Sequence, residues 1–192
     1  MRPADLRRAN LPGPILALVG WSGSGKTTLL TALLPTLIAR GLTVSTLKHA
    51  HHDVEPDHPG KDSYRHRLAG AQEVLLATNN RFALFCESNG NDALDLLTLT
   101  ARMAPADLYL AEGFKSAPVA KLEVYRASLG KAPLWPELSN VIAVAGDIEQ
   151  STCPLPFLPL SDVGVISNFI LTWRDRKLSV GPPLETSIQT GS

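Results

Sequence analysis

The segment from Gly20 to Thr27 limits the fold of this chain more than any other part of its sequence. It reads Gly-Trp-Ser-Gly-Ser-Gly-Lys-Thr, which is the Walker A spacing of a first glycine and a later Gly-Lys-Thr. A short apolar run at residues 15–19 precedes it, and leucines at helical spacing follow it. A strand, a glycine-rich loop and a helix in this order predict a P-loop nucleotide-binding domain.

The polar groups of this loop have distinct expected parts in binding a nucleotide. Glycines let backbone N–H groups turn toward phosphate oxygens, and the helix N-terminus adds the positive end of its dipole. Lys26 would contribute a charge to the β- and γ-phosphates, and Thr27 a hydroxyl oxygen to Mg²⁺. A glycine-rich turn without a ligand is the alternative, which the flanking strand and helix disfavour. The predicted nucleotide-binding residues of the loop are Gly20, Ser22, Gly23, Ser24, Gly25, Lys26, Thr27 and Thr28.

Two carboxylates are candidates for the magnesium and catalytic side of this site. Glu112 ends the apolar run at 108–111, where a parallel strand beside the loop would place it. Asp62, which Ser63 follows, ends a long polar segment where a switch region would reach the γ-phosphate. We predict that Thr27, Glu112 and Asp62 hold Mg²⁺ or its water; a solvent-facing strand end is the alternative for Glu112.

Asp147 is the candidate for recognition of the base. It follows the apolar run 141–145 and Gly146, and ligands of open parallel sheets bind at the carboxyl ends of such strands. A carboxylate accepts hydrogen bonds from both the ring N–H and the exocyclic amine of guanine, whereas adenine offers no such donor pair. The pattern favours guanine, and a turn-forming Gly-Asp pair is the alternative.

Alternating strands and helices indicate the fold class. The runs that read as strands lie at 15–19, 43–47, 108–111, 121–125 and 141–145. This order predicts an α/β, P-loop NTPase-like fold in three layers with a mostly parallel sheet. Residues 73–77 and 81–86, around Thr78-Asn79-Asn80, instead predict an added β-hairpin, whose edge is a candidate for pairing two copies of the chain.

Length and composition favour one nucleotide-binding domain over residues 13–175, with flexible ends at 1–12 and 176–192. Lys and Arg (18) balance Asp and Glu (18), so no basic field favours nucleic acid. No apolar run approaches the roughly 20 residues that cross a bilayer, so we expect no membrane partner. The two cysteines lack the spacing of a disulfide framework, so we expect a cytoplasmic location.

Residues 49–66 contain all five histidines together with several acidic residues. This segment is either a solvated loop or a transition-metal site, and the sequence leaves both interpretations open.

Several segments together resemble the MobB family, the molybdopterin-guanine dinucleotide biosynthesis adapter proteins. They are Leu47-Lys48-His49 with His51-His52, Gly60-Lys61-Asp62-Ser63, Arg81-Phe82-Ala83-Leu84, Glu112-Gly113-Phe114-Lys115 and Lys121-Leu122-Glu123-Val124. The resemblance runs from about residue 14 to residue 173.

The resemblance implies a homodimeric GTP- and Mg²⁺-binding adapter of molybdenum cofactor biosynthesis, with at most weak GTPase activity. Its partners would be a MobA-like guanylyltransferase and molybdopterin or its dinucleotide, because the family assists attachment of GMP to molybdopterin. The sequence before Asp147 departs from the Asn-Lys-x-Asp element of most GTPases. Two alternatives remain: a small-molecule kinase, for which Arg65 and Arg67 are the clustered arginines, and a metallochaperone GTPase that uses the histidine segment.

Overall fold

The structure is a computed structural model that describes residues 13–50, 55–87, 95–148 and 153–179. Within these ranges the chain forms two compact units: one contains the described residues of 13–49 and 100–179, and the other those of 50–99. The sequence predicts one domain over residues 13–175. In the structure, residues 50–99, which lie between the strands at 44–48 and 108–112, form a compact unit of their own. No helix among the described residues is long and apolar enough to cross a membrane.

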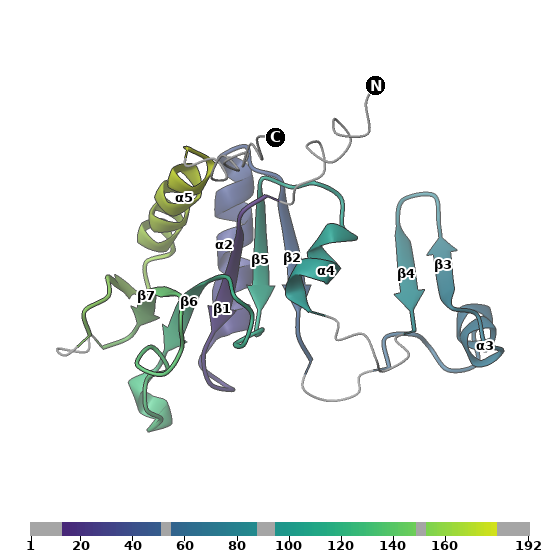
Figure 1. The fold of residues 1–192 in the computed structure, drawn as a ribbon, viewed down its shortest axis with the longest axis horizontal. Coiled ribbons are helices and arrows are strands. Elements are labelled where there is room, and N and C mark those ends of the chain that lie inside the picture. Colours follow the sequence, from purple (N-terminus) through teal and green to yellow (C-terminus); the bar gives the residue numbers. More distant parts are fainter. Residues whose placement is uncertain (1–12, 51–54, 88–94, 149–152, 180–192) are drawn as a thin grey trace, which may run out of the picture. The chain divides into compact units, whose positions relative to one another are not determined.

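A six-stranded sheet of strand order β2-β5-β1-β6-β7-β8 forms the centre of the first unit, and every pair in it is parallel (Figure 1). The strands are β1 (Ile15–Val19), β2 (Val44–Lys48), β5 (Leu108–Glu112), β6 (Ala120–Tyr125), β7 (Val141–Gly146) and β8 (Phe157–Pro159). The predicted mostly parallel sheet is confirmed. The sequence analysis missed β8, a short edge strand flanked by prolines.

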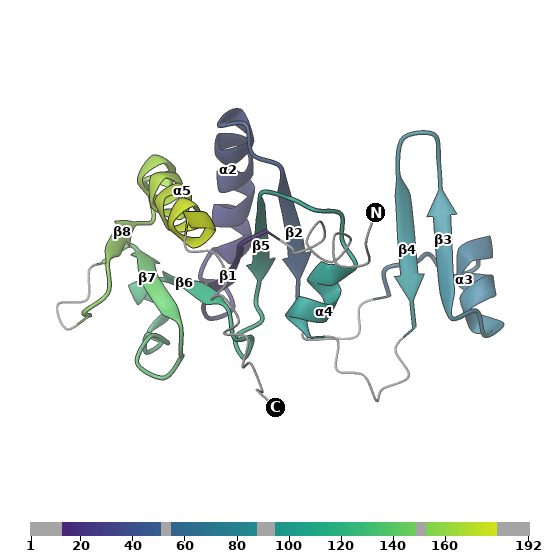
Figure 2. The same ribbon diagram turned by 45° about the horizontal axis from the view of Figure 1, so that its top comes forward.

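Two long helices, α2 (Lys26–Ala39) and α5 (Val163–Ser179), pack together on one face of this sheet (Figure 2). Leucines of α2 at helical spacing share a core with Ile166 and Ile170 of α5 and with alternate residues of the central strands. Asp162 precedes α5, and its Oδ1 accepts the N–H of Val165 at 2.9 Å, which caps the helix. Helix α5 continues to Ser179, past the predicted domain end at residue 175.

The opposite face of the sheet is also buried, although α2 and α5 are the only α-helices that lie wholly within the first unit as described. Tyr109 of β5 is fully buried, and its hydroxyl donates to the carbonyl oxygen of Ala104 at 2.7 Å. The chain that leads into β5 therefore covers this face of the sheet at Tyr109, where the sequence predicts a third layer. A 3₁₀ helix, η1 (Ala127–Leu129), follows β6.

The second unit contains helix α3 (Asp62–Leu68) and the antiparallel strands β3 (Glu73–Ala77) and β4 (Phe82–Cys86), so the predicted hairpin is confirmed. Helix α4 (Leu96–Ala101) spans the boundary between the units. Arg67 of α3 holds the second unit together. Its guanidinium lies 2.6 Å from both Glu55 and Glu87 and 5.6 Å from the ring of Phe85.

Parallel strand order places the carboxyl ends of the central strands at one edge of the sheet. In the β1–β5 register Leu18 is opposite Glu112, and in the β6–β7 register Tyr125 is opposite Gly146. The carboxyl ends of β1, β5, β6 and β7 therefore lie side by side. Gly20 after β1, Glu112 at the end of β5 and Asp147 after β7 are residues that the sequence predicts as part of a nucleotide site.

Candidate nucleotide-binding site

The predicted phosphate loop connects β1 to α2, and its backbone explains its glycines. Gly20 has a φ of +152°, and a Cβ on it would lie 2.4 Å from the carbonyl oxygen of Val124 in β6. Gly25 has a φ of +95° and is the residue that precedes helix α2. A side chain is excluded at the first position by this close approach and strained at the second by the left-handed backbone. The loop thus turns tightly into the helix N-terminus, where anions bind.

Lys26 lies over the mouth of this loop. Its Nζ donates to the carbonyl oxygens of Trp21, at 2.8 Å, and of Gly20, at 3.1 Å. These bonds hold the ammonium beside the loop, where a phosphate group would meet it.

Burial disfavours the protonated form of Lys26. Burial lowers the pKa of Lys26, an effect that the carboxylate of Glu112 opposes. The ammonium groups of Lys115 and Lys48 lower it further. An anion at this place would offset both the burial and the like-charge repulsion, which is the expected property of a phosphate site.

Thr27 and Glu112, the predicted magnesium residues, are in contact. The Thr27 hydroxyl donates to Oε1 of Glu112 at 2.7 Å, and Lys48 Nζ lies 3.5 Å from the same oxygen. The Glu112 side chain is largely buried, with 12 % of its surface exposed. A hydroxyl and a carboxylate oxygen at this distance fit Mg²⁺, which prefers oxygen ligands and binds few protein groups.

Ser24 differs from its neighbours in the loop. Ser22, Gly23, Thr27 and Thr28 are exposed, whereas Ser24 is buried, with 1 % exposure. Its backbone N–H donates to the Trp21 carbonyl oxygen at 3.2 Å, and its hydroxyl has no hydrogen-bond partner among the described residues. The Ser24 side chain therefore supports the loop from within.

Arg126 is a site residue that the sequence analysis missed. It follows β6, and its Nε donates to the carbonyl oxygen of Ser24 at 3.1 Å. A Cβ on Gly25 would lie 3.4 Å from the same guanidinium. A positive charge is thus fixed against the phosphate loop. The sequence signal was a lone arginine after a strand, which is too common to point to a phosphate site.

Asp147 directly follows β7, and its Oδ1 accepts the backbone N–H of Ala127 at 3.0 Å. The carboxylate borders a cavity of about 260 Å³ at the same edge of the sheet. Because Arg126 both lines this cavity and contacts the phosphate loop, the cavity adjoins the loop. The residues that line it are Arg126, Gly146, Asp147, Phe157, Pro159, Leu160 and Ser161.

Comparisons with known proteins give the family of this chain. A family model described as MobB, molybdopterin guanine dinucleotide synthesis protein B, matches residues 15–147, from the start of β1 to Asp147. The chain belongs to the MobB family. It is 41 % identical over 167 residues to the molybdopterin-guanine dinucleotide biosynthesis adapter protein of Escherichia coli, covering 85 % of this chain and 95 % of that one. A probable adapter protein of the same name from Bacillus subtilis is 34 % identical over 165 residues, 84 % of this chain and 93 % of that one.

Solved MobB structures share the fold. The crystal structure of Bacillus subtilis MobB aligns with a TM-score of 0.66 at 28 % identity, over 83 % of this chain and 96 % of that one. A structure of molybdopterin-guanine biosynthesis protein B aligns with a TM-score of 0.65 at 26 % identity, over 83 % and 99 %. The MobB resemblance seen in the sequence and the predicted fold class are thereby confirmed.

Asp62, the third predicted magnesium residue, lies in the second unit of this MobB protein, at the start of α3. Its carboxylate is exposed and lies 3.8 Å from Nη1 of Arg65. Its part in the nucleotide site stays a prediction from the sequence.

The histidine segment is described only in part. His51 and His52 lie outside the described residues, and the His49 ring lies 5.2 Å from the ring of Phe114. Among the described residues, no group of three or more His, Cys, Asp and Glu side chains is arranged to hold a metal ion.

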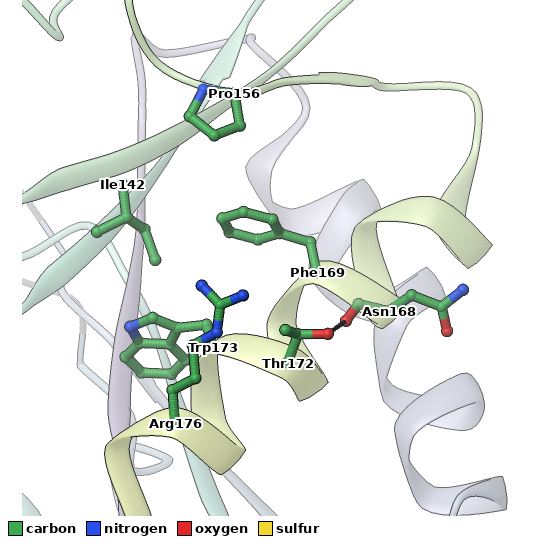
Figure 3. A pocket seen from close by; sticks show the side chains of 7 residues that line it. All are labelled: Ile142, Pro156, Asn168, Phe169, Thr172, Trp173 and Arg176. Carbon is green, nitrogen blue, oxygen red and sulfur yellow. Dashed lines mark hydrogen bonds between the residues drawn. The ribbon is translucent and has the colours of Figure 1, made fainter. Parts of the chain in front are cut away.

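A cavity of about 430 Å³ lies between α5 and the β7–β8 edge of the sheet (Figure 3). The rings of Phe169 and Trp173 and the side chain of Ile142 form its apolar wall, and the guanidinium of Arg176 lies between the two rings in the view of Figure 3. None of the predicted nucleotide residues borders it. It has no assigned part in nucleotide binding.

Proposed function

We propose that this protein is a GTP-binding adapter in molybdenum cofactor biosynthesis, which assists a MobA-like guanylyltransferase in attaching GMP to molybdopterin. The observation that carries the proposal is the Thr27–Glu112 contact beside a loop that holds Lys26 over its mouth, in a chain of the MobB family. The relatives from Escherichia coli and Haemophilus influenzae are both named molybdopterin-guanine dinucleotide biosynthesis adapter protein.

The phosphates of GTP would lie in the loop from Gly20 to Thr28. Backbone N–H groups, the α2 N-terminus and the charges of Lys26 and Arg126 favour an anion there. Mg²⁺ would take oxygen ligands from Thr27 and Glu112 and neutralise part of the phosphate charge. The role of these residues is to bind and orient the nucleotide.

Guanine would occupy the cavity beside Asp147. One oxygen of this carboxylate is anchored by the Ala127 N–H, which orients the side chain. The remaining lone pairs can accept the two donors of guanine, and the ring of Phe157 adds an apolar wall. This arrangement selects guanine over adenine because an unpaired carboxylate facing adenine would lose its solvation without gaining a donor.

A homodimer is the assembly that the hairpin favours. The β3–β4 register pairs Leu75 with Leu84 and Ala77 with Phe82, which places these side chains on one face of the hairpin. Leu75, Leu84 and Phe82 are 59 %, 48 % and 71 % exposed, whereas Val74 on the opposite face is buried. An apolar face of this kind on a soluble protein marks an interface, and we propose that a second copy of the chain covers it.

The alternative functions have less support from the structure. The arginines that a kinase would close over its phosphates are engaged within the second unit, since Arg67 pairs with Glu55 and Glu87 and Arg65 lies near Asp62. A metallochaperone would use the histidine segment, of which His51 and His52 lie outside the described residues. The adapter function is the preferred assignment because the relatives from Escherichia coli and Haemophilus influenzae carry that name.

Reconstitution tests the proposal directly. The purified protein is added to the guanylyltransferase, GTP and molybdopterin, and the dinucleotide formed is measured by chromatography. We expect the protein to raise the initial rate, and the Lys26→Ala variant to lose most of this stimulation together with GTP affinity. A stimulation that is equal in wild type and Lys26→Ala, or absent from both, would refute the proposal. Lys177→Gln, an exposed charge change on α5, is the matched control.

A further inference from the structure

We infer that Trp21, Lys115 and Lys131 form a second ligand site beside the phosphate loop, which takes a phosphate group carried on a planar heteroaromatic ring. The three residues are called the indole platform below. The inference rests on the proposed function and deepens it, because it gives the class of substrate that the adapter would hold next to the nucleotide.

The indole of Trp21 is the first part of this platform. Trp21 is the second residue of the phosphate loop, yet 37 % of its surface is exposed. Its Nε1 donates to the carbonyl oxygen of Ala132 at 2.8 Å, so the edge of the ring is held in place. Phosphate loops bind through backbone N–H groups and a lysine, so binding of the triphosphate does not require an indole here. An aromatic face presented in this way is suited to stacking.

Two ammonium groups rest on the same ring. Lys115 Nζ lies 4.7 Å from the ring centroid, and Lys131 Nζ lies 5.8 Å from it. Both distances are within the roughly 6 Å of a cation–π contact. The lysines come from different segments, one after β5 and the other after η1. Within the described part of the chain, neither ammonium forms an ion pair with a carboxylate.

This concentration of positive charge exceeds what the phosphate loop itself needs. The chain as a whole has a formal net charge of zero, so a basic composition does not explain it. Lys115 and Lys131 place two ammonium groups within 4.7 and 5.8 Å of the ring centroid of one partly exposed indole. Two such charges beside the phosphate loop favour a second anionic group next to the nucleotide phosphates.

The chemistry of the platform identifies the class of ligand. Lysine ammonium groups bind phosphate as point charges, and indole rings stack on flat heteroaromatic systems. The Trp21 carbonyl oxygen accepts a hydrogen bond from Lys26, which places the platform directly beside the phosphate cradle. A dinucleotide joins its two halves through their phosphates, so the half that receives GMP must also carry a phosphate. A phosphorylated pterin combines both features.

Calorimetric titration with a model ligand tests this site. Neopterin monophosphate is titrated into protein saturated with Mg²⁺ and a non-hydrolysable GTP analogue, and also into the nucleotide-free protein. Neopterin without phosphate and inorganic phosphate are the two partial ligands. We expect the complete ligand to bind about tenfold or more tightly than either part, since charge and stacking both contribute.

Variants separate the platform from the nucleotide site. Lys115→Gln combined with Lys131→Gln should weaken neopterin monophosphate about tenfold or more, change GTP affinity little and leave neopterin unaffected. Trp21→Leu should instead reduce the difference between the complete ligand and inorganic phosphate. Lys177→Gln is the control for loss of a single exposed charge and should bind all ligands as wild type.

Three results would overturn the inference. In the first, neopterin monophosphate binds no more tightly than inorganic phosphate. In the second, it binds equally to the wild type and to the double lysine variant. In the third, it competes with GTP for the same site. Failure of GTP to bind is a separate outcome, since it refutes the proposed nucleotide function and leaves the nucleotide-free titration to decide on the platform. The two failures are thus distinguished by different titrations.

Discussion

Replacing Asp147 with asparagine changes one carboxylate oxygen into an amide nitrogen and removes a negative charge from the proposed guanine cavity. In the wild type, Oδ1 accepts the N–H of Ala127 at 3.0 Å. The variant should keep its remaining oxygen on this N–H, because leaving a backbone donor unpaired costs about 1–3 kcal/mol. The new amide group would then face the donors of guanine.

The magnitude follows from this orientation. A donor that faces a donor loses at least one charged hydrogen bond, which contributes about 1.5–3 kcal/mol. GTP affinity should fall by about tenfold to a hundredfold, since each 1.4 kcal/mol corresponds to about tenfold. ATP affinity should change little, because adenine lacks the donor pair. Xanthine carries a carbonyl oxygen where guanine has its amine, so the variant should gain affinity for XTP.

Calorimetric titration of wild type and Asp147→Asn with the Mg²⁺ complexes of GTP, ATP and XTP measures all three effects. Asp175→Asn removes an exposed carboxylate from α5 and is the matched control, with no expected change for any nucleotide. Equal losses of GTP and ATP in Asp147→Asn would refute the argument. Asp147 would then serve only to hold Ala127, and base recognition would lie elsewhere.

Three further predictions address the metal, a buried carboxylate and the hairpin. Glu112→Gln should weaken Mg²⁺-dependent GTP binding about tenfold and leave binding in EDTA nearly unchanged, as titrations with and without Mg²⁺ will show. Burial raises the pKa of Glu123 above its ordinary value of 4.5. The contribution of this carboxyl group to the unfolding free energy should therefore be greatest below pH 4.5 and should fall as pH rises through the raised pKa. Glu123→Gln should remove that part of the slope in urea titrations, and an identical slope contradicts the assignment. Leu84→Asp should convert a dimer into a monomer by light scattering, with Leu178→Asp as the control; a wild type that is monomeric at micromolar concentration rejects the dimer.

The parts of the site that could be predicted from sequence are those that depend on neighbouring residues. The loop from Gly20 to Thr27 has its strand and helix directly beside it, so local spacing was sufficient. Glu112 was predictable because a carboxylate at the end of an apolar strand reaches the ligand edge of a parallel sheet. The hairpin was indicated by two apolar runs around a short polar turn.

The residues that were missed depend on contacts between distant segments. The hydrogen bond from Arg126 to the Ser24 carbonyl oxygen joins residues 102 positions apart, and no local sequence pattern predicts it. Glu123 alternates with apolar residues in β6 and therefore reads as solvent-facing. The structure buries it on the second face of the sheet, where it accepts the N–H groups of Leu134 and Trp135 at 2.7 and 2.8 Å. The separate unit 50–99 is likewise a property of tertiary contacts.

One segment, residues 127–135, connects the proposed base site to the indole platform. Ala127 at its start donates to Asp147, Ala132 accepts the Trp21 indole N–H at 2.8 Å, and the last two residues donate to the buried Glu123. A change at the base site that shifts this segment must also shift the carbonyl oxygen that holds the Trp21 ring. The contacts therefore predict that the two ligands influence each other's binding.

Thermodynamic linkage makes this coupling measurable from either side. If GTP changes the affinity for neopterin monophosphate by some factor, neopterin monophosphate must change the affinity for GTP by the same factor. We expect a factor of about five or more, and we expect Glu123→Gln to reduce it because the segment loses part of its anchor. Four titrations, each ligand with and without the other, give the factor twice. A factor of one in the wild type, with both ligands bound, would show that the segment only supports the two sites and does not couple them.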